Sequence, residues 1–166
     1  PSPETLLGHL RAQLSWVRNQ YKAEEYRMVK IFTSGSFFDP EEVPTGFLSD
    51  VATAFRGKLI IAETRPEFVD PDIVSSFIEI LDEGSYKKPL YCAIGLETSS
   101  ASIRSKSVNK GFSFQDFKKA STAAHSTGAG VKAYLLFKPL FLTEGEAVSD
   151  MKKSIGDITM HADMIS

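Results

Sequence analysis

Apolar residues along the chain follow two periodicities that alternate with each other. Five runs are apolar at nearly every position, and they start near Arg27, Lys58, Leu90, Val131 and Ala162. The starts are about 31, 32, 41 and 31 residues apart, which is the length of a strand plus a crossover helix. Between the runs, apolar residues recur at the 3.6-residue spacing of an amphipathic helix. The pattern predicts parallel strands that alternate with helices, in a sheet covered on both faces.

Residues that start and stop helices fall between these runs. Three pairs combine an N-cap with a proline at the first helical position: Ser2-Pro3, Asp39-Pro40 and Asp70-Pro71. Two further pairs have the spacing of a capping box: Ser113 with Asp116, and Thr143 with Glu146. Helix ends are predicted at Gly57, Gly84 and either Gly128 or Gly130. We therefore expect helices to start at all five of these caps.

The chain length decides between the α/β architectures that fit this order. A closed eight-fold barrel usually needs about 200–250 residues, and the chain has 166. A partial barrel and an open sheet both remain. We predict an α/β fold in which residues 1–166 form a single domain, a fragment of a partial (β/α)6 TIM-type barrel with parallel strands. Because the chain starts with Pro1 and ends in a strand-like run, we expect it to be a piece of a longer protein, truncated at both ends.

Polar side chains follow four consecutive strands at the points where the strands end. These segments are Thr33-Ser34-Gly35-Ser36, Glu63-Thr64-Arg65-Pro66-Glu67, Gly95 to Ser100, and Lys138-Pro139 with Lys132 and Tyr134 earlier on the same strand. The carboxyl ends of parallel strands meet at one rim, where α/β proteins bind their ligands. The convergence predicts a binding site at this rim.

Each rim segment also has a purely structural interpretation. Ser34-Gly35-Ser36 is either a turn before a helix or a loop in which Gly35 lets the backbone approach a ligand amine. Glu63 and Arg65 share a strand face, so they either pair with neighbouring charges or face a ligand. Glu97 either lies beside the next helix start, which Ser99 or a neighbour caps, or accepts hydrogen bonds from both hydroxyls of a ribose. The sequence leaves these alternatives open.

Residues 103–112 and the single cysteine complete the set of candidates. This segment carries Arg104, Lys106 and Lys110. It is either a solvated turn between helices or a clamp for a phosphate or carboxylate, a role that suits the guanidinium of Arg104. Cys92 lies mid-strand and is expected in the core, and the three histidines share no metal-binding spacing, so no metal ligand is predicted. Phe37 and Phe38 are either core residues or the wall of a site for an adenine or a substrate.

Composition and charge exclude several classes of protein. The net charge of −2 gives no overall electrostatic footprint for nucleic acid. The apolar runs are far shorter than a membrane span. We therefore expect no membrane partner and a cytoplasmic protein.

Four segments in this order resemble the radical S-adenosylmethionine (SAM) enzymes. They read "FTSGSFFDPEEVP", "ETRPEFV", "AIGLETSSASIRSKSVNKGF" and "GAGVKAYLLFKPLFLTEGEAVSDM", and the similarity covers nearly the whole chain. The resemblance is strongest to the archaeal branch that makes archaeosine, which is related to the elongator-type and methylthiotransferase branches. It implies a barrel that binds SAM and a [4Fe-4S] cluster at its carboxyl rim.

The resemblance also assigns roles to the rim residues. The loop Ser34-Gly35-Ser36 corresponds to the one that holds the methionine amino group of SAM. Glu97, with Ser99 close by, corresponds to the position that meets the ribose hydroxyls. The region of Arg104 corresponds to the contact with the SAM carboxylate, and the strand that carries Lys132 lines the adenine. With Glu63 and Arg65 these residues are the predicted cofactor site; no catalytic residue is predicted.

The CxxxCxxC motif of the family, whose thiolates ligate three irons, is absent from these 166 residues. We therefore expect the cluster ligands to lie outside this chain and the isolated fragment to be inactive. For the intact protein, the resemblance implies reductive cleavage of SAM to a radical. That radical would abstract hydrogen from a lysine-conjugated deazaguanine base in tRNA, so that a lyase reaction leaves archaeosine. The implied partners are tRNA and an electron-donor protein; the oligomeric state is not indicated.

Three other interpretations remain open, the first of them also implied by the resemblance. The chain is alternatively another radical SAM Fe-S oxidoreductase of the methylthiotransferase kind. It is alternatively a phosphate-binding barrel hydrolase or aldolase that uses no SAM. A catalytically inert barrel that serves as a binding scaffold is the non-enzymatic alternative.

Overall fold

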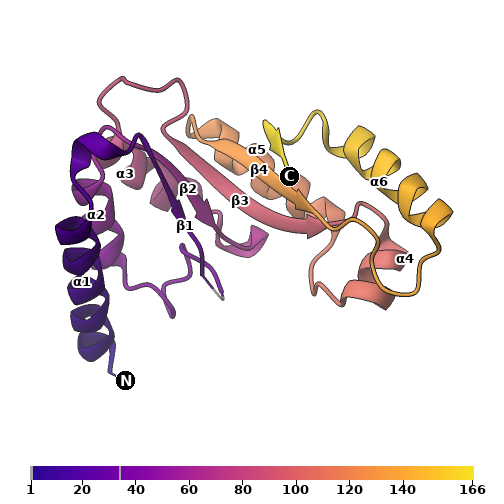
Figure 1. Cartoon of the computed structure of the whole chain (residues 1–166), viewed down its shortest axis with the longest axis horizontal. Coiled ribbons are helices and arrows are strands. Elements are labelled where there is room, and N and C mark those ends of the chain that lie inside the picture. Colours follow the sequence, from indigo (N-terminus) through magenta and orange to yellow (C-terminus); the bar gives the residue numbers. More distant parts are fainter. Residues whose placement is uncertain (1, 34) are drawn as a thin grey trace.

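Five parallel strands form one sheet whose spatial order is the chain order (Figure 1). In the computed structural model, which describes residues 2–33 and 35–166, the strands are β1 (Met28–Ile31), β2 (Leu59–Glu63), β3 (Leu90–Glu97), β4 (Gly130–Leu135) and β5 (Met164–Ile165). The helices are α1 (Pro3–Gln20), α2 (Thr45–Ala54), α3 (Pro71–Leu81), α4 (Ala101–Ile103), α5 (Phe114–Ser126) and α6 (Glu144–Ile158). Short helical segments are η1 (Ala23–Glu25), η2 (Pro66–Phe68) and the π-helical η3 (Arg104–Val108). The predicted α/β class with parallel strands is confirmed.

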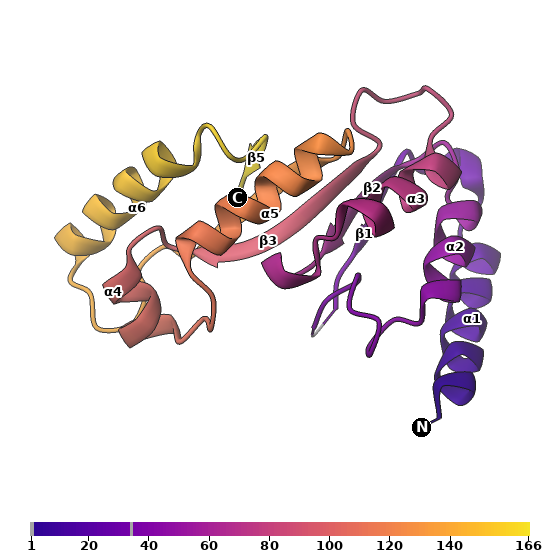
Figure 2. The same ribbon diagram turned by 180° about the vertical axis from the view of Figure 1, so that it is seen from behind.

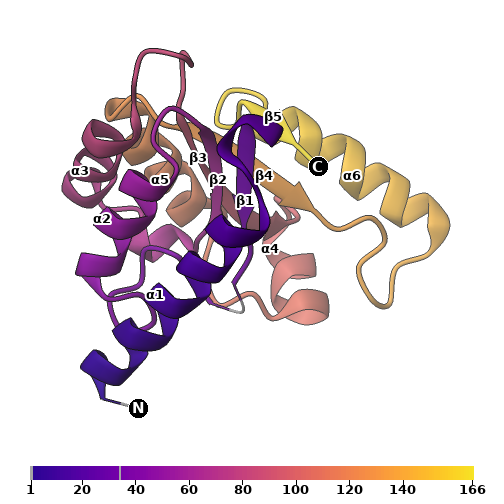
Figure 3. The same cartoon turned by 60° about the vertical axis from the view of Figure 1, so that its left-hand side comes forward.

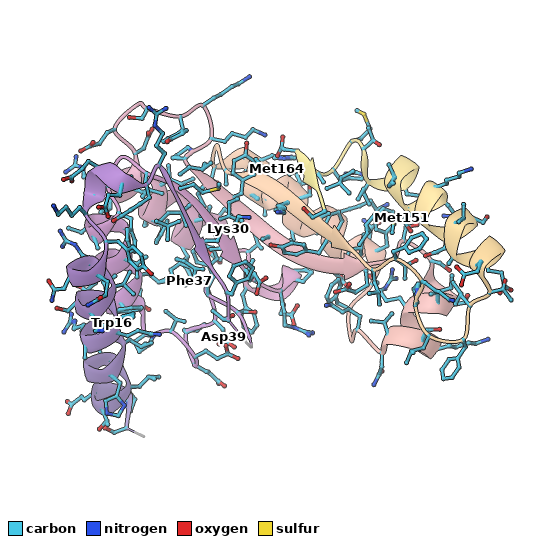
Figure 4. All side chains as sticks on the ribbon, viewed as in Figure 1. Trp16, Lys30, Phe37, Asp39, Met151 and Met164 are labelled. Carbon is cyan, nitrogen blue, oxygen red and sulfur yellow. The ribbon has the colours of Figure 1, made fainter. Side chains whose placement is uncertain are left out.

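The two faces of the sheet differ in what covers them. One face carries the fully buried apolar residues of the core, which are Ile60, Ala62, Leu90, Cys92, Ile94, Leu96, Val131 and Ala133. Figure 2 shows α3 and α5 lying across the strands on this outer face. The opposite, inner face is open toward the viewer in Figure 1, and Lys30 and Met164 lie on it in Figure 4. The sheet was expected to be covered on both faces, but within the described residues the helices that cover the strands pack on the outer face alone, as in a partial barrel.

Strand register groups the inner-face residues into transverse rows. Glu63 pairs with Ala93, Ala93 with Lys132, and Lys132 with Met164. One step nearer the carboxyl ends, Gly95 pairs with Tyr134. Partners in such a row point to the same face of the sheet. The inner face therefore mixes charged, aromatic and very small side chains.

Four of the five predicted helix starts are confirmed. Ser2 and Asp70 each accept a hydrogen bond from a backbone N–H of the first turn, and the capping boxes at Ser113 and Thr143 are both formed reciprocally. Gly57, Gly84 and Gly128 adopt positive φ at the predicted helix ends, whereas Gly130 is the first residue of β4. The caps fix where each crossover begins and ends.

The helix predicted at Asp39-Pro40 is wrong. Asp39 instead starts a single turn, in which its side chain accepts a hydrogen bond from the N–H of Glu41 and its carbonyl accepts one from Val43. Pro44 interrupts that turn, because the residue before a proline is disfavoured in helical conformation. The helix α2 accordingly begins at Thr45, and residues 35–44 stay a loop above the ends of β1 and β2.

The helices at the two ends of the sheet lie far from each other. In Figure 3, α1, α2 and α3 lie on the left-hand side, with α3 next to α2, and α6 lies on the right, beyond β4. None of the helices within residues 2–33 and 35–166 combines the length and apolar character needed to cross a membrane.

Candidate functional site

A pocket of about 460 Å³ lies on the inner face at the carboxyl ends of β1 to β4. Its lining residues are Phe32, Thr33, Gly35, Glu63, Thr64, Arg65, Ala93, Gly95, Glu97, Lys110, Phe112 and Tyr134. The volume falls in the range of small-molecule sites, about 300–1,000 Å³. The predicted convergence of rim residues is therefore present in the structure.

Glu97 reaches this pocket through an unusual backbone conformation. The register of β3 against β4 shifts between Gly95 and Glu97, and Glu97 has a φ of 68°. Positive φ is costly for a residue with a side chain, and such strain concentrates at binding sites. A β-bulge re-aims the side chain that follows it. Here it directs the Glu97 carboxylate over Gly95, where Oε1 accepts a hydrogen bond from Nζ of Lys110 at 2.7 Å.

Gly95 is the floor on which this ion pair lies. A Cβ atom added to Gly95 would come within 2.7 Å of both Glu97 Oε1 and Lys110 Nζ. Any larger residue would therefore displace the pair and fill the pocket. The sequence signal for Gly95 was its place near the end of an apolar run.

The loop after β1 forms a second wall. Gly35 lines the pocket, and a Cβ at this position would meet the Glu42 carboxylate at 1.9 Å. That carboxylate accepts a hydrogen bond from the N–H of Ser36 at 2.9 Å. Ser36 is fully buried, and its Oγ accepts a hydrogen bond from the N–H of Arg65. The predicted site residue Ser34 lies outside the described residues.

Thr33, the residue before position 34, carries a polar group without a hydrogen-bond partner among the described residues. Its Oγ1 is buried and has no hydrogen-bond partner in the part of the chain that the structure describes. Buried hydroxyls are almost always hydrogen-bonded in proteins. The Thr33 hydroxyl and the Glu42 carboxylate are therefore the polar side-chain groups of this wall.

Glu63 and Arg65 both reach the pocket but do not pair with each other. Arg65 donates from Nε to Glu67 at 2.6 Å, and its guanidinium lies 5.6 Å from the centre of the Phe112 ring. Oε2 of Glu63 accepts a long hydrogen bond, 3.4 Å, from the N–H of Thr33. Burial, and after it the negative charge of Glu63, raises the pKa of Tyr134. Glu63 and Tyr134 both line the pocket.

Lys132 lies one row deeper than Tyr134. The residue is only 8% exposed, and its ammonium lies 5.0 Å from the centre of the Tyr134 ring. Because Lys132 pairs in register with Ala93, which lines the pocket, its side chain is on the pocket side of the sheet.

Arg104 and Ser99 are placed beside the pocket rather than in it. The buried Arg104 donates hydrogen bonds to the carbonyl oxygens of Phe112 and Thr98, at 3.0 and 2.9 Å. Burial lowers its pKa, against the opposing effect of Asp116. The Ser99 hydroxyl donates a hydrogen bond to Asp157 of α6 at 2.6 Å, and the Ser99 N–H donates one to Oγ of Ser154 at 2.9 Å. In this structure both residues hold the end of β3 in place.

The sequence missed several residues of the site. On the candidate segment 103–112 it is Lys110 that lines the pocket, whereas Arg104, the favoured anion ligand, donates to two backbone carbonyls. Glu42 was part of a predicted helix start. The aromatic walls are Phe32 and Phe112; no sequence signal separated them from the other phenylalanines.

Phe37 and Phe38, the aromatic residues that the sequence offered as a possible wall, belong to the core. They are 2% and 1% exposed and pack edge-to-face against Phe77 of α3. Their place in the loop after β1 suggested the rim, but the loop folds them under the sheet edge onto α3.

The described residues contain no ligand set for an iron–sulfur cluster. Cys92 faces the outer side of the sheet, and burial raises the pKa of its thiol to about 12. A cluster needs thiolates, so Cys92 does not fit that role. Across residues 2–33 and 35–166, no group of three or more histidine, cysteine or acidic side chains is arranged to hold a metal ion.

The sequence is similar along its whole length to a protein named archaeosine synthase subunit beta from Methanosarcina acetivorans. The two are 42% identical over 170 residues, which is 100% of this chain and 47% of the relative. The chain spans less than half the length of the curated relatives it matches. No protein-family model matches it.

Solved structures agree on the fold. Coproporphyrinogen III oxidase (HemN) of Escherichia coli, described as a radical SAM enzyme, superimposes with a TM-score of 0.64 and 11% identity over 100% of this chain and 38% of its own. Elp3 of Methanocaldococcus infernus gives a TM-score of 0.63 and 15% identity over 99% of this chain and 43% of its own. These comparisons confirm the partial-barrel fold and the resemblance to the radical SAM enzymes.

Proposed function

We propose that this chain is the SAM-binding barrel of a radical SAM enzyme that makes archaeosine in tRNA, because it is homologous over its whole length to a protein named for archaeosine synthesis. That homology is the observation that carries the proposal. The pocket supports it, since its polar groups suit the two ends of an adenosyl amino acid.

The residues of the pocket divide between those two ends. Glu42 and the backbone around Gly35 and Ser36 would receive the ammonium of the methionine part, and the free hydroxyl of Thr33 would donate to its carboxylate. Glu97 would accept hydrogen bonds from the two ribose hydroxyls, as an ionised carboxylate can with its two oxygens. Lys110 holds that carboxylate in position before a ligand arrives.

The aromatic residues would enclose the flat part of the ligand. Phe32, Phe112 and Tyr134 all line the pocket, and aromatic faces stack well on a nucleobase. Arg65, which lies over Phe112, would stiffen that wall. When bound, SAM supplies the hydrogen-abstracting chemistry of the family, and the chain positions it and excludes water.

The remaining parts of the proposal concern the assembled enzyme. The [4Fe-4S] cluster would be ligated by cysteines outside residues 1–166, because Cys92 does not fit. The reaction would be a carbon–nitrogen cleavage that leaves archaeosine from a lysine-conjugated deazaguanine base in tRNA. An electron-donor protein would reduce the cluster, and the enzyme would act in the cytoplasm.

Deleting the gene for this chain in its host, followed by mass spectrometry of tRNA nucleosides, tests the proposed function. We expect archaeosine to disappear and the lysine-conjugated nucleoside to accumulate. Complementation with the unchanged gene or with the exposed control Glu79→Gln should restore archaeosine, whereas Glu97→Gln should not. Archaeosine that persists in the deletion strain would overturn the proposal.

Binding of SAM to the chain itself tests the assignment of the pocket. Isothermal titration calorimetry should show Glu97→Ala weakening the Kd for SAM by about tenfold, the value of one charge-assisted hydrogen bond. An unchanged Kd would remove Glu97 from the site.

A further inference from the structure

Two opposite charges face each other on the inner face of the sheet without forming an ion pair. Glu63 on β2 and Lys132 on β4 lie in the same transverse row, on either side of Ala93 on β3. The other neighbour of Lys132 in this row is Met164, which cannot pair with it. Within residues 2–33 and 35–166, the Lys132 ammonium forms neither an ion pair nor a hydrogen bond. The undescribed positions are a proline and a serine, which carry no carboxylate.

The Lys132 ammonium is available to bind an anion. Lys132 is more than nine-tenths buried, and its ammonium lies 5.0 Å from the centre of the Tyr134 ring. A bound anion would give this partly desolvated ammonium a partner that the described residues do not supply. Glu63 can bind a cation in the same way, because among the described residues its Oε1 has no partner and its Oε2 accepts only the long bond from Thr33.

The strand spacing sets how far apart the two side chains start. Two spacings of about 4.8 Å separate the Cα atoms of Glu63 and Lys132 by about 9.6 Å. Both side chains rise from the same face of the sheet, so one ligand that carries a cation and an anion close together can contact both. Between them Ala93 contributes only a methyl group, and it lines the pocket.

We propose that Glu63 and Lys132 form a subsite for the zwitterionic end of an α-amino acid carried by the substrate, with Lys132 binding the carboxylate and Glu63 the ammonium. This inference rests on the proposed function, in which the substrate base is conjugated to lysine and so carries an α-amino acid end, as SAM also does. The methionine end of SAM is assigned to the loop at Gly35 and Glu42, at the rim. The row of Ala93 lies deeper, four residues along β3 from Glu97.

A set of three small probes tests the subsite on the unmodified chain. Nε-acetyl-L-lysine carries both charged groups, N-acetylcadaverine lacks the carboxylate, and 6-acetamidohexanoate lacks the ammonium. Each is titrated into ¹⁵N-labelled chain to about 50 mM, because fragments of this size bind at about the millimolar level. The amide signals of Ala93 and Gly95 report on the row. We expect the zwitterion to bind at least about tenfold more tightly than either one-charge probe.

Variants then assign each charge to its residue. Lys132→Met should abolish the preference over N-acetylcadaverine and keep the preference over 6-acetamidohexanoate; Glu63→Gln should do the opposite. Lys132→Arg keeps the cation and should keep both preferences. Equal binding of all three probes to the unmodified chain, or no shift at Ala93 and Gly95, overturns the inference whether or not a variant folds.

Two further measurements distinguish the possible outcomes. One shows whether the row binds the amino-acid end of the substrate or that of SAM, and the other shows whether the subsite or the proposed function is wrong. The resemblance places Lys132 on the strand that lines the adenine of SAM, whereas this inference assigns its ammonium to the substrate, and titration of Lys132→Met with SAM decides between the two. A large loss of SAM affinity, without any zwitterion preference in the unmodified chain, would give the row to SAM and overturn the inference. Loss of archaeosine on gene deletion combined with equal probe binding would overturn only the subsite. Persistent archaeosine combined with a zwitterion preference would overturn only the proposed function.

Discussion

The carboxylate of Asp163 binds residues of β4 and of neighbouring segments at the end of the sheet opposite the pocket. Its replacement by asparagine tests how much these contacts stabilise the fold. Asp163 accepts hydrogen bonds from the N–H of Val131 at 2.8 Å and from Nε2 of His125 at 2.9 Å, and it forms an ion pair with Lys88. Asp163→Asn keeps the shape of the side chain and removes the charge.

The size of the effect follows from the pKa of Asp163. Burial alone would raise it, but hydrogen bonds from Lys88, from the N–H of Val131 and from His125 hold it at about 2, below its ordinary value of 3.8. At 1.36 kcal/mol per pKa unit, the charged form is favoured by about 2 kcal/mol in the folded state. The side chain is 28% exposed, so solvent screening reduces this to about 1–2 kcal/mol. For a domain of this size the Tm should fall by about 5 °C.

Urea denaturation followed by circular dichroism, at a series of pH values, measures the effect. The pKa of Asp163 is lower in the folded than in the unfolded chain, so its contribution is complete above about pH 4 and is lost as the pH falls toward 2. The difference in unfolding free energy between the unchanged chain and Asp163→Asn should therefore be constant from pH 5 to 7 and shrink below about pH 4. Glu79→Gln, an exposed carboxylate on α3, is the matched control and should show no such window. Equal stability of Asp163→Asn and the unchanged chain at pH 7 would refute the reasoning.

Two other substitutions test the pocket and its support. Gly95→Val should displace the Glu97–Lys110 pair and fill the floor of the pocket, so calorimetry should show SAM affinity falling by at least about tenfold with little change in Tm; an unchanged Kd would contradict the placement of SAM. Arg104→Met should lower the unfolding free energy by about 2 kcal/mol in urea, because two buried backbone carbonyls lose their donor, whereas Arg18→Met, at an exposed position on α1, should have no effect.

The features that could be predicted from the sequence are those set by local chemistry. Strands begin within two residues of the predicted starts, because runs of apolar residues between glycines and prolines have few alternatives. The caps at Ser113 and Thr143 form because a hydroxyl and an acidic residue three positions apart satisfy free N–H groups wherever the helix lies. The polar residues at the strand ends could also be found from the sequence, because they follow directly after each apolar run.

What could not be predicted depends on how separate segments meet. Arg104 was the better anion ligand by its chemistry, but η3 turns it inward to two carbonyls and leaves Lys110 to face Glu97. Phe37 and Phe38 follow β1 directly, yet α3 offers Phe77 as an aromatic partner and draws them into the core. The apolar strands also gave no sign that one face of the sheet would stay open, because Ile61 and Ala93 look like core residues in the sequence and yet lie on the inner face.

The division of labour between the two faces explains how a small barrel fragment can leave charged groups unpaired. The outer face carries a continuous apolar core under α2, α3 and α5, and hydrophobic burial there provides the stability of the sheet. The inner face does not have to provide that stability, and two small residues, Ala93 and Gly95, lie at its centre. Glu63 and Lys132 rise on either side of Ala93 without pairing, whereas Glu97 pairs with Lys110 above Gly95. A face built only for stability would place larger apolar side chains at these two positions; here the small residues leave room for the pocket between the charges.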